Sequence, residues 1–228
     1  LWRFPYLAAQ YGGGIFLLVY LILAVTFGFA LLTAEIAIGR KTKLSPVLAY
    51  KKLNKKFSFL GYIATLVPII IIPYYCVIGG WVTKYVTVYA QGLVAPVAKD
   101  GYFSDFIGHP VAPLVFFLIF MLLSIVVIML GVKKGIEKLS KFLMPLLIVL
   151  TIGIAIYALT LPNAMEGVKY YLIPDFSKFS ILTVAGAMSQ LFYSMSIAMG
   201  IMVTYGSYTR DDVNLTKSVN RIEFFDTL

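Results

Sequence analysis

Charged residues are scarce in this sequence. Only 13% of its 228 residues are Asp, Glu, Lys or Arg, whereas 61% are hydrophobic, and the mean hydropathy is +0.91. Soluble globular domains carry about 25% charged residues, so this composition excludes an ordinary soluble protein. The single Cys, Cys76, and the single His also exclude an intrachain disulfide and a zinc site built from imidazoles and thiolates.

Acidic residues are the rarer of the two charges, with 10 against 19 basic residues. No nucleophile, base and orienting group occur together, so we do not expect an enzyme. The net charge of +9 does not indicate nucleic acid as a partner, because the basic residues lie in short loops rather than on an amphipathic face with interleaved aromatics. We expect the lipid bilayer as the partner instead.

Four long runs contain no Asp, Glu, Lys or Arg, at residues 57–83, 111–132, 142–165 and 179–209. Each is long enough to cross a hydrocarbon core of about 30 Å as a helix. A fifth span is expected over 15–38, after a half-length helix in 1–11 and a glycine turn at 12–14. The sequence therefore predicts an all-α, polytopic membrane protein.

The loops indicate the orientation of these spans. Residues 39–56 hold seven basic residues and no acidic one, whereas residues 92–110 hold Lys99 against Asp100 and Asp105. Because cytoplasmic loops retain positive charge, the first loop is expected to face the cytoplasm. We expect a multi-pass protein of the cell membrane.

The last uncharged run is longer than one straight span requires. As a single helix, residues 179–209 would measure about 46 Å, and small and polar residues gather around their midpoint, Ser194. They either allow close packing of helices or mark a point where the helix unwinds. Together with the half-length helix in 1–11, the second alternative matches the discontinuous helices with which secondary transporters bind solutes. Half-helix amino ends attract anions and freed carbonyls coordinate cations, as a zwitterionic amino acid with sodium would require.

Four separated motifs are specific enough to indicate a family. They are LWRFPYL at 1–7, GGGIFLLVY at 12–20, AEIAIGR at 34–40 and TYGSY at 204–208. In this respect the chain resembles the neurotransmitter:sodium symporter family, and in particular its bacterial amino-acid transporters. The similarity extends from the second half of the family's first membrane helix to the start of its seventh. The resemblance implies an inverted-repeat transporter fold, here incomplete, with residues 1–228 forming one transmembrane domain truncated at both ends.

The resemblance also implies roles for individual residues. The substrate-binding residues would be Ile71, Tyr75, Tyr193, Ser194, Ser196 and Met199. Sodium would be bound by Ser194 and Asp226. The gates would use Arg3, Tyr193 and Tyr208, and the supporting residues would be Tyr20, Glu35 and Gln190.

Taken without the family, several of these residues have simpler interpretations. Tyr75 could be a helix-packing tyrosine and Arg3 an arginine that snorkels to the interface. Glu35 is either an interfacial carboxylate or a brace for unwound backbone. Asp226 could be an acidic residue in the first turns of a helix.

The function expected from the resemblance is sodium-coupled import of an amino acid, with an apolar or aromatic side chain, by alternating access. Tyr20, Gln190 and Ser194 match residues around chloride in the chloride-dependent animal members, which carry asparagine at the position of Asp226. A fixed carboxylate there would replace the anion, so we expect chloride-independent transport. A non-transporting amino-acid sensor and an ion channel remain as alternatives.

Overall fold

The computed structural model describes residues 3–227, apart from the side chain of Lys133. Within these residues the chain is helical and contains no β-strand, only an isolated antiparallel bridge between Gly13 and Pro174. The chain divides into two compact units, one of residues 1–68 with 158–228 and the other of residues 69–157. The all-α architecture expected from the composition is confirmed.

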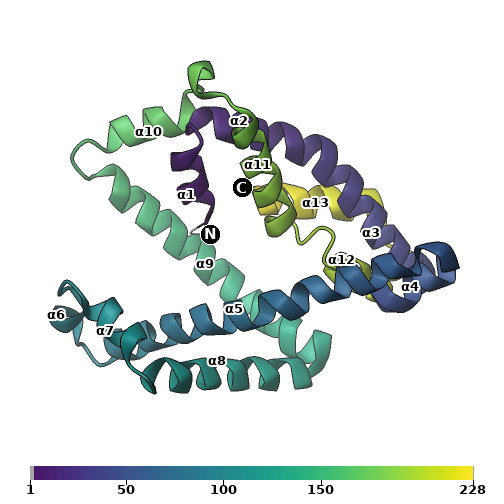
Figure 1. The fold of residues 1–228 in the computed structure, drawn as a ribbon, viewed down its shortest axis with the longest axis horizontal. Helices are drawn as coiled ribbons and strands as arrows, with labels where there is room; N and C mark the ends of the chain where they lie inside the picture. Colours follow the sequence, from purple (N-terminus) through teal and green to yellow (C-terminus); the bar gives the residue numbers. More distant parts are fainter. Residues whose placement is uncertain (1–2, 228) are drawn as a thin grey trace. The chain divides into compact units, whose positions relative to one another are not determined.

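The first unit contains both ends of the described chain and the broken span (Figure 1). Its helices are α1 (Arg3–Gln10), α2 (Gly14–Leu23), the π-helical turn η1 (Ala24–Gly28), α3 (Phe29–Thr42), α4 (Pro46–Leu53), η2 (Lys55–Phe57), the start of α5 (Ser58–Ala90), α10 (Ala164–Leu172), η4 (Phe176–Lys178), α11 (Ile181–Ser194), α12 (Ile201–Tyr208) and α13 (Leu215–Thr227).

A glycine turn joins α1 to the first full span. Gly12 and Gly13 have φ values of 94° and 60°, a region that other residues rarely occupy. A Cβ on Gly13 would also lie 2.2 Å from the carbonyl oxygen of Tyr170, so the position has no room for a side chain. The expected turn is confirmed, and α2, η1 and α3 together form a stretch, Gly14–Thr42, that is long and apolar enough to cross a membrane.

The second unit is built from the remaining apolar spans. It holds the rest of α5, the short helices α6 (Val94–Val97) and α7 (Tyr102–Gly108), α8 (Ala112–Met129), the π-helical turn η3 (Val132–Glu137) and most of α9 (Lys138–Leu159). In this unit α5 and α8 lie close together. A Cβ on Gly80 of α5 would be only 2.7 Å from the backbone nitrogen of Phe117 in α8.

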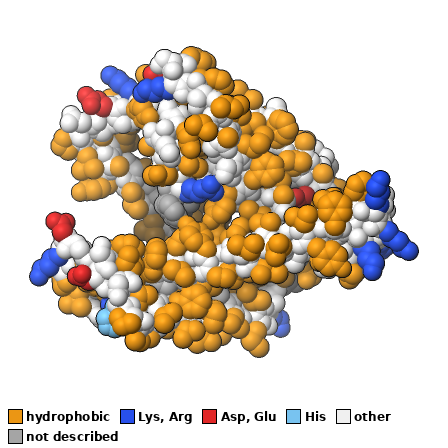
Figure 2. All heavy atoms as spheres, viewed as in Figure 1, with side chains coloured by type: hydrophobic (Ala, Val, Ile, Leu, Met, Phe, Trp, Pro, Cys, Tyr) orange, Lys and Arg blue, Asp and Glu red, His pale blue; other side chains and the backbone are white. Residues whose placement is uncertain are grey.

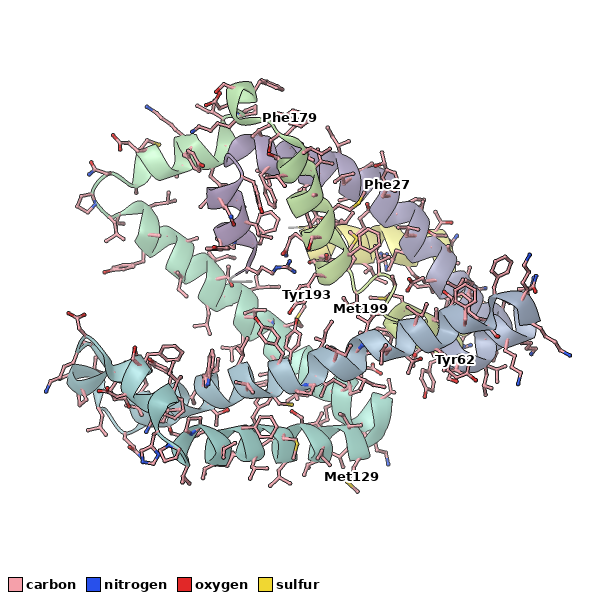
Figure 3. All side chains as sticks on the ribbon, in the orientation of Figure 1. Phe27, Tyr62, Met129, Phe179, Tyr193 and Met199 are labelled. Carbon is pink, nitrogen blue, oxygen red and sulfur yellow. The ribbon has the colours of Figure 1, made fainter. Side chains whose placement is uncertain are left out.

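Four helices of the described chain are long and apolar enough to span a bilayer. They are Gly14–Thr42, Lys55–Ala90, Ala112–Met129 and Lys134–Leu159. Their apolar side chains are largely exposed, including Phe27, Tyr62 and Met129, which point away from the helices that carry them (Figure 3). Such exposure suits a surface that faces lipid rather than water.

The core of the first unit lies between α1, α2 and α11. Its buried residues are Ala8, Phe16, Tyr20, Leu23, Ala24, Ala187, Leu191, Met195 and Ile197. A second close contact joins α3 to α12, where a Cβ on Gly39 would lie 1.9 Å from the carbonyl oxygen of Val203. This packing fixes both halves of the broken span against the first full span.

Candidate substrate and ion site

The span that the sequence predicts to be broken is broken in the structure. Helix α11 begins at a capping box of Ser180 and Thr183 and ends at Ser194, and α12 begins only at Ile201. Between them, Ser196, Ala198 and Gly200 have positive φ values of 53°, 63° and 68°. Three left-handed residues within six positions are incompatible with a continuous α-helix. The discontinuous helix is therefore confirmed near the expected midpoint.

The broken segment is held by a carboxylate from the first full span. Glu35 is 8% exposed, and its Oε1 accepts a hydrogen bond from the backbone nitrogen of Ala198 at 2.6 Å. Its Oε2 is buried and has no hydrogen-bond partner in the described chain. On the other side, Met195 and Ile197 are buried in the core between α1, α2 and α11. The bend is thus fixed by one charged hydrogen bond and by packing.

Oxygen atoms gather at the end of α11. The Ser194 hydroxyl donates to Oδ2 of Asp226 at 2.9 Å, which joins α11 to α13. Tyr20, 2% exposed, interacts with Ser194 through its hydroxyl. One turn earlier on α11, Gln190 is 5% exposed and its Oε1 has no donor in the described residues. Among the residues that the structure describes, Asp226 makes no ion pair with a basic side chain.

Arg3 of α1 also contacts α11. A guanidinium nitrogen of Arg3 donates to the hydroxyl of Ser189 at 2.9 Å, and its central carbon lies 4.8 Å from the centre of the Tyr193 ring. Sequence reasoning named Arg3 and Tyr193 for a gate but not Ser189 as a partner. Ser189 could have been found from the sequence, because it is one of the small and polar residues that gather around Ser194.

The remaining predicted residues lie in three places. Ser196 and Met199 are half-buried within the broken segment. Figure 3 labels Met199 in this segment and Tyr193 near the end of α11. Tyr208 is the last residue of α12 and is 67% exposed. Ile71 and Tyr75 lie on α5 in the second unit, so their place beside the other residues stays a prediction. We also expect the helical backbone to be unwound beside Leu1, and this position lies outside the described residues.

A cluster at the carboxyl-terminal end of α3 was missed from the sequence. Lys43 Nζ lies 3.1 Å from Oδ1 of Asp211 and also donates to the carbonyl of Thr209. Arg40 donates to the carbonyl of Val213 at 2.8 Å. These contacts tie the loop between α12 and α13 to the first full span. The sequence shows the two cations and the acid but not that they meet.

A helix broken in mid-span and oxygen atoms grouped at the break are features of the class of secondary transporters with discontinuous membrane helices. The model of the sodium:neurotransmitter symporter family matches residues 1–95 and 103–227. The chain belongs to this family, and the resemblance stated from its motifs is confirmed.

Individual relatives agree with this assignment. The chain is 34% identical to the sodium-dependent transporter YhdH of Bacillus subtilis, with 97% of this chain and 50% of the relative covered. It is 35% identical to the sodium-dependent transporter MJ1319 of Methanocaldococcus jannaschii, with coverages of 95% and 46%. The rat sodium- and chloride-dependent taurine transporter is 27% identical, with coverages of 93% and 42%. The chain thus spans about half the length of these relatives.

A solved structure shows the same arrangement of helices. The crystal structure of MhsT in complex with L-phenylalanine matches all of this chain and 53% of its own, with a TM-score of 0.93 and 38% sequence identity. The expected transporter fold is confirmed by this match, and the chain is a multi-pass membrane protein.

Proposed function

We propose that the full-length protein is a sodium-coupled symporter that imports an amino acid across the cell membrane by alternating access. One observation carries the proposal, namely the break between α11 and α12 beside a carboxylate without a basic partner in the described chain. Broken membrane helices in secondary transporters expose backbone dipoles to a solute and its coupling ion. The names of the bacterial and archaeal relatives, both sodium-dependent transporters, support the same function.

We propose sodium as the coupled ion because the groups at the break are oxygen atoms rather than thiolates or imidazoles. Asp226 supplies a negative charge, Ser194 a hydroxyl, and Gln190 a buried oxygen without a donor in the described chain. Hard cations prefer oxygen ligands of this kind. In this proposal Ser194 and Asp226 bind the sodium ion, while Tyr20 and Gln190 support them.

The substrate that we propose is an amino acid with an apolar or aromatic side chain. Ile71, Tyr193 and Met199 would line the side-chain pocket, and none of them carries a charge. The Tyr75 hydroxyl would donate to the substrate carboxylate, and backbone at Ser196 would receive the ammonium group. Support comes from MhsT, a relative described in complex with L-phenylalanine.

We further propose that transport does not require chloride. The carboxylate of Asp226 provides a fixed negative charge beside Ser194, where a bound anion would otherwise balance the charge of sodium. The rat taurine transporter, a relative named as sodium- and chloride-dependent, would then differ from this protein in how the charge of sodium is balanced.

The proposal is tested by reconstituting the full-length protein in vesicles and measuring uptake of labelled phenylalanine. We expect uptake under an inward sodium gradient, none when potassium replaces sodium, and no loss when gluconate replaces chloride. Binding of phenylalanine without uptake would indicate a sensor instead. Sustained unitary currents in a bilayer without substrate would indicate a channel.

A further inference from the structure

Four exposed lysines form a cluster on the segment between the first two full spans. The lysine cluster consists of Lys51, Lys52, Lys55 and Lys56, at the end of α4 and in η2. No acidic residue occurs anywhere in residues 39–56. Figure 2 shows basic side chains gathered where α4 lies in Figure 1.

The lysine cluster differs from several other basic groups assigned to the cytoplasmic side, which are paired with acidic side chains. Lys43 is paired with Asp211, Lys141 with Glu137 at 2.7 Å, and Arg210 with Asp212 at 2.9 Å. Among the described residues, the four lysines of the cluster make no ion pair. Their charge is therefore not balanced by acidic side chains in this part of the chain.

The contacts that the cluster does make leave its charge available. Lys52 Nζ donates to the carbonyl of Thr42 at 3.4 Å, a long hydrogen bond to a neutral acceptor. Lys56 Nζ lies 5.9 Å from the centre of the Phe57 ring. Neither contact supplies an anion, so each ammonium group retains room for one.

Helix α4 presents this charge on an amphipathic surface. Pro46 and Ala49 are buried, while Leu48, Lys51 and Lys52 are exposed on the opposite face of the helix. The inner face is held against the start of α5, since a Cβ on Gly61 would lie 2.7 Å from the carbonyl oxygen of Pro46. One side of α4 is therefore packed against the protein, and its lysines lie on the exposed side.

Exposed apolar side chains lie next to the lysines in the sequence. Leu48 is 49% exposed, Leu53 44%, Phe57 46% and Phe59 51%. Cations interleaved with exposed apolar groups are typical of segments that lie in the interface of a bilayer, where the apolar groups enter the acyl region and the cations meet headgroups. The cluster also lies at the start of the candidate membrane span Lys55–Ala90, which places it near the surface of the cytoplasmic leaflet.

We propose that the lysine cluster is a binding site for anionic phospholipid headgroups of the cytoplasmic leaflet. The phosphate of the headgroup would be held by two or more ammonium groups, while Leu48 and Phe57 contact its acyl chains. The apolar contacts favour a phospholipid over a soluble phosphate, because free phosphate has nothing to place against them. The site is separate from the proposed sodium and substrate residues.

The experiment is native mass spectrometry of the full-length protein in detergent with an equimolar mixture of phosphatidylglycerol and phosphatidylcholine. The test variant is Lys51→Gln/Lys52→Gln/Lys55→Gln, and the matched control is Lys134→Gln/Lys138→Gln/Lys141→Gln, which removes the same charge from another cytoplasmic loop. A lysine near an anionic surface contributes about 1 kcal/mol, or about fivefold. We therefore expect the ratio of bound phosphatidylglycerol to phosphatidylcholine to fall at least fivefold in the test variant and to change less than twofold in the control.

Three results would overturn the proposal. One is an unchanged lipid ratio in the test variant, and another is an equal fall in both variants, which would indicate a response to net charge alone. The third is displacement of phosphatidylglycerol by an excess of inorganic phosphate, which would mean that the site takes soluble phosphate. Binding of substrate in sodium, measured on the same samples, verifies that each variant is folded.

Discussion

Replacement of Glu35 by alanine tests whether the bend in the broken span depends on its carboxylate. Oε1 of Glu35 accepts the backbone hydrogen of Ala198 at 2.6 Å from a side chain that is 8% exposed. A hydrogen bond to a charged group contributes about 1.5–3 kcal/mol, and its loss leaves a backbone donor without an acceptor. If substrate binds only when the segment is bent, loss of this hydrogen bond raises the free energy of the binding-competent state by the same amount, and substrate binding weakens accordingly. We expect Glu35→Ala to weaken substrate binding about 10- to 150-fold.

The assay is equilibrium binding of labelled phenylalanine to the purified full-length protein in sodium buffer, with the melting temperature measured in parallel. Glu35→Gln keeps an acceptor for Ala198 but removes the charge, so it should lose less affinity than Glu35→Ala. Glu166→Ala, at an exposed position near the start of α10, is the control and should bind as the wild type does. Wild-type affinity in Glu35→Ala would refute the idea that the carboxylate holds the bend.

The turn before the first full span and the break in the last span could be predicted because each depends on residues that are close together in the sequence. The run 179–209 is longer than a bilayer requires, and its polar residues gather at one depth, around Ser194. Gly12 and Gly13 mark a turn because they tolerate positive φ. The long spans follow from uncharged runs alone. These features depend on neighbours in the sequence rather than on the packing of distant segments.

The contacts that shape the site depend on segments far apart in the chain and were out of reach of sequence reasoning. Arg3 and Ser189 are 186 residues apart, and Lys43 meets Asp211 only because α12 packs against α3. The π-helical turn η1 was also missed, for a different reason. Residues 24–28 carry no charge and continue the same uncharged run, so the pattern used to find the span does not indicate a local change in winding.

Three further perturbations test separate parts of the proposed site. Asp226→Asn removes the charge beside Ser194, and a unit charge about 4 Å from a cation is worth about 4 kcal/mol at an effective dielectric constant of 20. We expect at least a tenfold rise in the sodium concentration for half-maximal phenylalanine binding; an unchanged value would exclude Asp226 as a sodium ligand. Tyr193→Ala removes the ring 4.8 Å from Arg3, whereas Tyr193→Phe keeps it. A cation–π contact contributes about 0.5–2 kcal/mol, so we expect about 2- to 30-fold weaker substrate binding in the alanine variant alone, and equal losses in both would assign the effect to the hydroxyl. Gly39→Ala tests the contact between α3 and α12, because the added Cβ would lie 1.9 Å from the carbonyl oxygen of Val203 and force the broken span away from its support. Overpacking of this kind costs about 1–3 kcal/mol, so the melting temperature of the full-length protein should fall. Gly153→Ala adds the same methyl group where nothing lies within 4 Å, and it should raise the stability slightly through helix propensity. Equal melting temperatures for the two variants would mean that α3 and α12 are not packed so closely, and the fixed support that the bend requires would be absent.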